Sequence, residues 1–243
     1  MTNRINIYFE IWRQDSFDTN GEFRKYYLKD ISTSLSLLEA LDKLNEEIII
    51  DDKRPINFDH DCREGICGSC GFLVNGQAHG HLPSTTVCQL YMRHFKNNDV
   101  IKIEPWRAKA FPIIQDLAVD RTSLDNLITS GGYYNVNTGD GIDCDEVLIK
   151  PDNAFSSFQT ATCIGCGACV ASCRNSSANL FAAAKLAHLA QLPQGNEEKF
   201  KRKKLIKKQL KIEGFGSCSN NLECEAACPK EISSDWISWM NKI

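Results

Sequence analysis

Long apolar runs are missing from this sequence. No stretch of its 243 residues reaches the about 18 consecutive apolar residues that a membrane-spanning helix requires. The first residues contain no unbroken apolar core, so we expect no secretory signal and therefore no structural disulfides. The formal net charge is −3, without an excess of Lys and Arg, so we expect no nucleic-acid partner.

Cysteine, by contrast, is abundant. The chain contains 12 cysteines, and without a signal peptide this number indicates metal chemistry in a reducing compartment. A hydrophobic content of 42% and a charged content of 24% are typical of a folded protein. The length allows two domains of ordinary size.

Two cysteine runs in the second half share one spacing. The first, CIGCGACVASC, begins at Cys163, and the second, CSNNLECEAAC, begins at Cys218 and continues into Pro229. This is the spacing of two-cluster ferredoxins, in which the fourth cysteine of each run binds the cluster of the other run. Crossing the two runs predicts a 4Fe–4S cluster held by Cys163, Cys166, Cys169 and Cys228.

The second run lacks one cysteine of this frame, because Asn221 stands where its second cysteine should be. An amide is a poor ligand for iron compared with a thiolate, so the corner iron should be missing. We therefore predict a 3Fe–4S cluster held by Cys173, Cys218 and Cys224. Structural zinc, which paired CxxC units also bind, is the alternative, although seven interlocked cysteines fit zinc poorly.

A different cysteine pattern lies in the first half. The stretch HDCREGICGSC, with one further cysteine downstream, has the C-x4-C-x2-C…C spacing of plant-type 2Fe–2S ferredoxins. It predicts a 2Fe–2S cluster held by Cys62, Cys67, Cys70 and Cys88. The intervening glycines allow backbone N–H groups to approach the sulfur atoms closely, which should raise the potential of the cluster.

Three polar residues near this pattern have open roles. The charge of Arg63 could also favour reduction of the cluster, or the side chain could be solvated. His79 and His81 lie between the third and fourth cysteines, and a Rieske-type histidine ligand is conceivable. We favour histidines without iron, because four cysteines already complete the site.

Strand patterns surround the first cysteine group. Apolar and polar residues alternate over residues 5–11, which predicts a half-buried strand, and residues 23–28 are expected to pair with it after an Asn-Gly turn. Ser36 and Glu39 form a capping box before a helix over residues 36–47. Asn75-Gly76 predicts a hairpin turn, and residues 100–103 a last strand that ends at Pro105. We expect a small α+β domain over residues 1–105.

Helical patterns dominate the rest of the chain. We expect a connector over residues 106–140 and a helical domain over 141–243, with helices over 178–192 and 197–210. Cys144 is the twelfth cysteine, and the three clusters need only eleven ligands. Its flanking Asp residues should raise its pKa, so we expect an inert thiol.

Segment 199–211 holds eight Lys and Arg residues and no acid, which indicates either a solvated face or a contact with an anionic lipid or an acidic partner.

The three cysteine groups in this order closely resemble the iron–sulfur subunit of succinate dehydrogenase and fumarate reductase. The motifs are CREGICGSC, CIGCGACVASC and C-x5-C-x3-CP, and the resemblance covers essentially the whole chain. It implies an α+β fold class, with an N-terminal β-grasp domain like a plant-type 2Fe–2S ferredoxin, followed by an all-α helical ferredoxin-like domain.

The resemblance also implies a function. Family members relay single electrons from a flavoprotein subunit with covalent FAD, through the 2Fe–2S, 4Fe–4S and 3Fe–4S clusters, to quinone at a membrane anchor that often carries haem b. They lie peripherally on the cytoplasmic side of the bacterial inner membrane. This chain offers no acid–base pair or nucleophile, so we assign it no catalytic residue and expect dicarboxylate chemistry on the flavoprotein.

Two alternatives remain open from the sequence. One is the iron–sulfur subunit of a related flavin oxidoreductase of the glycolate or heterodisulfide type, although these lack a plant-type N-terminal domain. The other is a free ferredoxin-like carrier, which would be a monomer in the soluble fraction.

Overall fold

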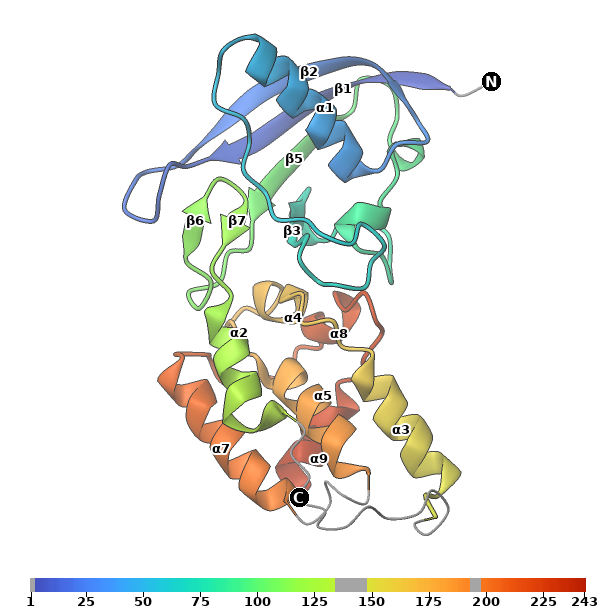
Figure 1. Cartoon of the computed structure of the whole chain (residues 1–243), viewed down its shortest axis with the longest axis vertical. Coiled ribbons are helices and arrows are strands. Elements are labelled where there is room, and N and C mark those ends of the chain that lie inside the picture. The colour runs from blue at the N-terminus through green and yellow to red at the C-terminus, as the bar shows by residue number, and fades with distance from the viewer. Residues whose placement is uncertain (1–2, 134–147, 193–197) are drawn as a thin grey trace, which may run out of the picture.

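The computed structural model describes residues 3–133, 148–192 and 198–243. Figure 1 shows an α+β molecule with a sheet and one helix at one end and most of the helices at the other. The strands are β1 (Arg4–Arg13), β2 (Glu22–Ser32), β3 (Phe72–Val74), β4 (Gln77–Ala78), β5 (Val100–Pro105), β6 (Ile113–Gln115) and β7 (Ala118–Val119). The helices are α1 (Leu37–Ile50), α2 (Thr122–Leu127), α3 (Pro151–Ala161), α4 (Ala168–Ala171), α5 (Asn179–Ala190), α7 (Lys199–Ile212), α8 (Glu223–Ala226) and α9 (Asp235–Lys242). Short 3-10 helices are η1 (Val87–Gln89) and η2 (Met92–His94), and η3 (Ile128–Gly132) is a π-helix.

The main sheet has the order β2-β1-β5-β3-β4. β1 pairs antiparallel with β2 and parallel with β5, and β5 pairs antiparallel with β3. The predicted alternation along β1 is confirmed, because Ile7, Phe9 and Ile11 are fully buried and face the core. α1 covers this face of the sheet (Figure 1) and buries Leu37, Leu38, Leu41 and Leu44 in the same core.

The capping box that begins α1 is confirmed. The hydroxyl of Ser36 accepts a hydrogen bond from the Glu39 N–H at 3.2 Å, and the Glu39 carboxylate accepts one from the Ser36 N–H at 2.6 Å. These bonds satisfy two N–H groups that the first turn of a helix leaves unpaired. The helix continues to Ile50, three residues further than predicted, before Asp52 adopts a left-handed backbone with φ 57°.

Residues 106–133, the described part of the predicted connector, contain β6, β7, α2 and η3. The turn between β6 and β7 inserts Asp116 into the sheet half, where it is fully buried and paired with Arg13 at 3.1 Å and Arg54 at 2.7 Å. Burial alone would raise the pKa of this carboxylate, but the hydrogen bonds from Arg54 and from backbone N–H groups outweigh burial and lower the pKa. This segment is therefore anchored to the sheet, while the domain boundaries at 105 and 140 stay a prediction.

The helical half is built around α5, which packs against α3, α7 and α9. Leu180, Phe181 and Ala184 of α5 are buried. Near its start, the Ser177 hydroxyl accepts a hydrogen bond from the Asn179 N–H at 3.3 Å. The two helices that the sequence predicts in this half are present as α5 and α7, and their bounds lie within two residues of the predicted ones. No helix in the described ranges is long and apolar enough to cross a membrane.

Candidate functional site

The first cysteine loop lies between α1 and β3, and backbone N–H groups point at its sulfur atoms. The N–H of Glu64 donates to Cys62 Sγ at 3.3 Å, and that of Cys67 donates to the same atom at 3.4 Å. The N–H of Ser69 donates to Cys67 Sγ at 3.4 Å. These bonds, led by that from Glu64, lower the pKa of Cys62 to about 7, because they stabilise the thiolate. The expected approach of N–H groups to sulfur is confirmed.

Cys70 and Cys88 form the buried side of the same group. Their thiols interact with each other, which raises the pKa of Cys70, together with burial, and lowers the pKa of Cys88. The Thr86 hydroxyl lies 3.2 Å from Cys88 Sγ. Cys67 in turn acts electrostatically on Cys70, so the structure brings the four cysteines of this pattern together.

The polar residues near the loop have structural contacts. Arg63 forms an ion pair with Asp42 of α1, which balances its charge and fastens the loop to the helix. The His79 ring packs edge-on against Trp106, with ring centroids 5.3 Å apart. The exposed His81 packs against Phe95 at 5.5 Å. Both histidine rings therefore contact aromatic side chains in the structure.

One pocket in the helical half gathers cysteines from both later runs. Its lining includes the thiols of Cys163, Cys166, Cys169 and Cys228, although the last comes from a distant part of the sequence. The walls are apolar, formed by residues such as Phe181 and Ile232. Burial raises the pKa of Cys166 to about 12 and also raises the pKa of Cys163 and Cys169. The pocket thus gathers four cysteines among apolar side chains.

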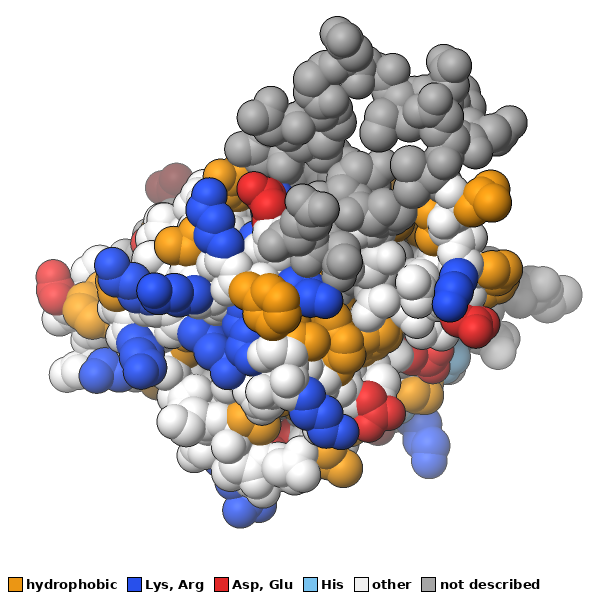
Figure 2. Space-filling view, turned by 90° about the horizontal axis from the view of Figure 1, so that it is seen from below, with side chains coloured by type: hydrophobic (Ala, Val, Ile, Leu, Met, Phe, Trp, Pro, Cys, Tyr) orange, Lys and Arg blue, Asp and Glu red, His pale blue; other side chains and the backbone are white. Residues whose placement is uncertain are grey.

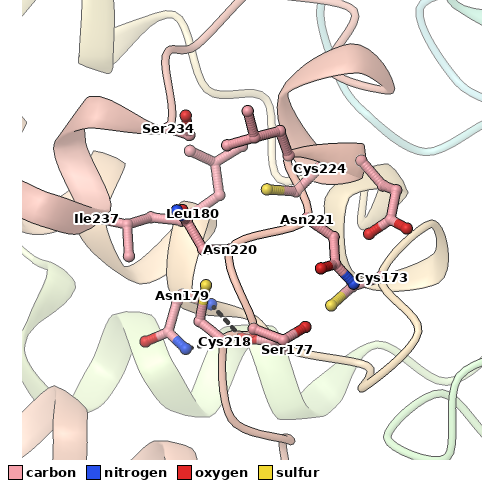
Figure 3. Close-up of a pocket in the computed structure, with 13 residues that line it drawn as sticks. Cys173, Ser177, Asn179, Leu180, Cys218, Asn220, Asn221, Cys224, Ser234 and Ile237 are labelled. Carbon is pink, nitrogen blue, oxygen red and sulfur yellow. Dashed lines mark hydrogen bonds between the residues drawn. The ribbon is translucent and has the colours of Figure 1, made fainter.

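A second pocket gathers the other three cysteines of the crossed runs. It is lined by Cys173, Cys218 and Cys224, with Asn221 on the loop between the last two (Figure 3). Burial raises the pKa of Cys224 to about 11, and the neighbouring Cys218 and Cys173 act in the same direction. The loop bends sharply, since Leu222 has a left-handed backbone with φ 64°, which is rare for a bulky residue. Asn221 therefore stands at the edge of a pocket that has three thiols.

The chemistry of these donors fits iron–sulfur clusters. Buried thiols that raise one another's pKa resist ionisation unless a cation lies beside them, and bound iron supplies that charge. In the part of the chain that the structure describes, no three His, Cys, Asp or Glu side chains are close enough to bind a single metal ion. A cluster spreads its thiolates over several irons, and the pockets with four and three cysteines offer such sets of thiols. Cys144 lies outside the described residues.

Sequence reasoning missed the contact between the first loop and the 4Fe–4S pocket. A Cβ on Gly68 would lie 2.2 Å from the Ile164 carbonyl oxygen, and Gly68 has φ 73°, so only glycine fits here. Arg121 donates to the carbonyl oxygen of Gly68 at 2.5 Å and to that of Cys166 at 3.3 Å. No spacing in the sequence marks Arg121, because its partners are distant along the chain.

The basic segment 199–211 forms most of α7 and divides into two faces. Arg202 points inward, where it is buried and pairs with Glu198 at 2.7 Å. An exposed stripe at helical spacing consists of Lys201, Lys204, Lys208 and Lys211. Figure 2, which looks onto the helical end of the molecule, shows Lys and Arg side chains gathered on the side where α7 lies. We call these four residues the lysine stripe.

Two known protein families match this chain, one over the first cysteine group and the other over the two later runs. The family "2Fe-2S iron-sulfur cluster binding domain" matches residues 8–126, and the family "4Fe-4S dicluster domain" matches residues 159–232. The first match contains the four cysteines of the first loop, and the second contains the seven cysteines that line the two pockets.

Curated relatives match over more of the chain. The fumarate reductase iron-sulfur subunit of Wolinella succinogenes is 31% identical over 62% of this chain and 58% of its own length. That of Escherichia coli O157:H7 is 26% identical over 96% of this chain and 90% of its own length. The succinate dehydrogenase iron-sulfur subunit of Bacillus subtilis is 25% identical over 96% of this chain and 89% of its own length.

A solved structure shares the fold. A chain of the structure titled "Mycobacterium smegmatis Sdh1 complex in the apo form" superposes with a TM-score of 0.70 at 18% identity, over 100% of this chain and 95% of that one. The order of the cluster domains, the relatives across nearly the whole chain and this shared fold agree. The chain is thus similar over nearly its whole length to the iron-sulfur subunits of fumarate reductases and a succinate dehydrogenase, and its 2Fe-2S and 4Fe-4S dicluster matches follow one another along the chain.

Proposed function

We propose that this chain is the electron-transfer subunit of a succinate dehydrogenase or fumarate reductase complex. The observation that carries the proposal is the pairing of two pockets, one lined by four cysteines and one by three with an asparagine beside them. A row of one-electron carriers needs such separate sites. Each pocket takes cysteines from both later runs, as in the two-cluster ferredoxin pattern.

The proposed ligands follow the three cysteine groups. The 2Fe–2S cluster is assigned to Cys62, Cys67, Cys70 and Cys88. The 4Fe–4S cluster is assigned to Cys163, Cys166, Cys169 and Cys228, and the 3Fe–4S cluster to Cys173, Cys218 and Cys224. When bound, each cluster takes up and releases one electron at a time.

The protein contributes ligands, hydrogen bonds and exclusion of water. Backbone N–H groups at Cys62 and Cys67 stabilise negative charge on sulfur, which favours the reduced state of a bound cluster. The apolar walls around the second group, including Phe181, keep water away from the thiolates. We also propose the finer folds: a β-grasp domain, which the sheet order β2-β1-β5-β3-β4 with α1 supports, followed by an α-helical ferredoxin-like domain.

The proposed partners are a flavoprotein subunit with FAD and a membrane anchor with haem b, with quinone at the interface. The names of the relatives, fumarate reductase and succinate dehydrogenase iron-sulfur subunits, support this assignment. We place the chain peripherally on the cytoplasmic side of the inner membrane, held there by the anchor.

The test is anaerobic purification of the tagged chain from its own cells, followed by electron paramagnetic resonance. We expect a flavoprotein and a haem-bearing membrane protein to copurify. Succinate should reduce the 2Fe–2S cluster, so that the signal of the reduced cluster appears. The air-oxidised sample should show a 3Fe–4S signal. A colourless protein without iron, or a soluble monomer that succinate does not reduce, would contradict the proposal.

A further inference from the structure

The first cysteine loop and the 4Fe–4S pocket meet at a buried junction between the two halves of the molecule. Gly68 of the loop approaches the carbonyl of Ile164 so closely that a Cβ there would lie 2.2 Å from the oxygen. Both residues are flanked by proposed ligands, Cys67 on one side and Cys163 on the other. The junction therefore joins the backbone segments that carry two different clusters.

Trp106 fills the other side of this junction. Its Nε1–H donates to the carbonyl oxygen of Cys166 at 3.0 Å, and the residue is 1% exposed. A Cβ on Gly71 would lie 2.5 Å from the same nitrogen, so the indole lies directly against the end of the first loop. Trp106 thus contacts one loop through its ring and the other through a hydrogen bond.

Arg121 binds both loops through one nitrogen. Its Nη1 donates to the carbonyl oxygen of Gly68 at 2.5 Å and to that of Cys166 at 3.3 Å. Cys166 therefore accepts from both Trp106 and Arg121. A guanidinium nitrogen carries two hydrogens, so it can serve both carbonyl groups at once.

The junction carries positive charge from Arg121 rather than from histidine. His79 is 1% exposed and packs edge-on against Trp106. Burial, with a smaller effect of Arg121, lowers the pKa of His79 to about 4, so its ring is neutral at neutral pH. The guanidinium nitrogen lies 3.3 Å from the carbonyl oxygen of Cys166, so its positive charge stands beside the 4Fe–4S loop.

We propose that Arg121, together with Trp106, is a positioning residue that clamps the 2Fe–2S loop to the 4Fe–4S loop and sets the separation of the two clusters. Its charge also raises the potential of the 4Fe–4S cluster, because a nearby cation favours the reduced, more negative state. This inference rests on the proposed function. Magnetic coupling between two spins and electron transfer between two centres both fall steeply with distance, so a small opening of the junction is measurable.

The experiment uses the purified complex and compares the parent with Arg121→Gln. Two quantities are measured: the spin-relaxation enhancement of the reduced 2Fe–2S signal when the 4Fe–4S cluster is also reduced, and the midpoint potential of the 4Fe–4S cluster. Arg121→Gln should lose part of the enhancement and shift the potential to a more negative value. Arg121→Lys should restore both in large part, because its ammonium keeps the charge and has three donors. Trp106→Phe should lose part of the enhancement with a smaller shift in potential, since it removes a donor but no charge.

Arg107→Gln is the matched control. Arg107 follows Trp106 in the chain, but its side chain is 52% exposed and pairs with Glu104. We expect no change in either quantity. Parent-like relaxation and potential in Arg121→Gln would overturn the inference alone, because the clusters would be present and unaffected. A parent without 2Fe–2S or 4Fe–4S signals would instead overturn the proposed function, and the inference with it.

Discussion

The first cysteine loop and the two later runs assemble similar groups of thiols by different routes. The four cysteines of the first group follow one another within one segment between α1 and β5, and backbone N–H groups of the same segment bind their sulfur atoms. Each pocket of the helical half instead combines thiols from two runs that are separated by α5 and α7. The first site is therefore local, whereas the other two depend on how the helices pack around α5.

Removing one ligand from each region tests this difference most strongly. Cys228→Ala should abolish the 4Fe–4S signal and loosen the helical half, because metal binding is coupled to folding where distant segments share a cluster. The 2Fe–2S signal should survive. Cys62→Ala is the matched variant and should abolish only the 2Fe–2S signal. Paramagnetic resonance, iron content and limited proteolysis are the measurements, and equal damage to both halves in either variant would contradict the comparison.

Asn221→Cys would make the second run complete. The new thiolate should bind a fourth iron and convert the 3Fe–4S cluster to 4Fe–4S, with a lower potential because negative charge is added. Each decrease of about 59 mV in the reduction potential of the cluster lowers the equilibrium constant for its one-electron reduction tenfold. Electron delivery to quinone should slow, while transfer from succinate to an artificial acceptor at the flavin should survive.

The measurement for Asn221→Cys is paramagnetic resonance of the air-oxidised complex. The parent should show a 3Fe–4S signal, and the variant should lose it. Asn220→Cys, one residue earlier on the same loop, is the control and should keep the parent signal. A parent without this signal and with eight irons in its two C-terminal clusters would mean that Asn221 or a solvent oxygen binds iron.

His79 lies in the sheet half and should make stability depend on pH. Burial lowers its folded pKa to about 4 from an ordinary 6.5, so below about pH 6.5 the unfolded chain binds the proton more readily. Stability is therefore present above this pH and is lost as the pH falls toward 4. Between pH 7.5 and 5 the loss should be about 2 kcal/mol.

His79→Phe should flatten this pH dependence, because the variant cannot titrate at this position. The apparent melting temperature of the anaerobic complex, recorded from pH 7.5 to 5, is the measurement. His81→Phe serves as the control, since His81 is exposed in the same loop and its replacement should keep the parent slope. A parent-like slope in His79→Phe would show that other groups dominate acid destabilisation.

The lysine stripe tests whether the helical half has a charged contact that the sheet half lacks. Replacing its four lysines by Gln should weaken attachment to the anchor or to anionic membrane, by about 1 kcal/mol per lysine at a lipid surface. The effect should shrink at high salt, because ions screen exposed charges. Vesicle and anchor cosedimentation at several ionic strengths is the measurement.

The control for the stripe replaces four exposed lysines of the sheet half: Lys25, Lys29, Lys43 and Lys53. These changes should leave attachment unaltered. Unchanged assembly of the stripe variant at every ionic strength would make the stripe only a solvated face.

The smallest effect is expected at Cys144. Eleven cysteines account for the three proposed clusters, so Cys144→Ser should leave all three signals and the activity intact. Loss of the signal of one cluster in this variant would overturn the assignment of the eleven ligands.

Features that depend on neighbouring residues could be predicted from the amino-acid sequence. The capping box at Ser36 and the alternation along β1 depend on residues a few positions apart, and both are present in the structure. Cysteine spacing is local for the same reason, because a cluster is small and its neighbouring ligands must come from one tight loop. The missing corner at Asn221 came from this spacing, and the proposed ligand sets came from the spacing within each run together with the crossing pattern of two-cluster ferredoxins.

Contacts between segments that are distant along the chain could not be predicted in this way. The pairing of Arg63 with Asp42, the burial of Asp116 between two arginines and the inward turn of Arg202 follow from packing of separate elements. The junction at Arg121 is the clearest case, because its hydrogen bonds join loops that lie far from it along the chain in both directions. Such contacts leave no periodic pattern, since they depend on the relative placement of whole elements rather than on the spacing of neighbouring residues.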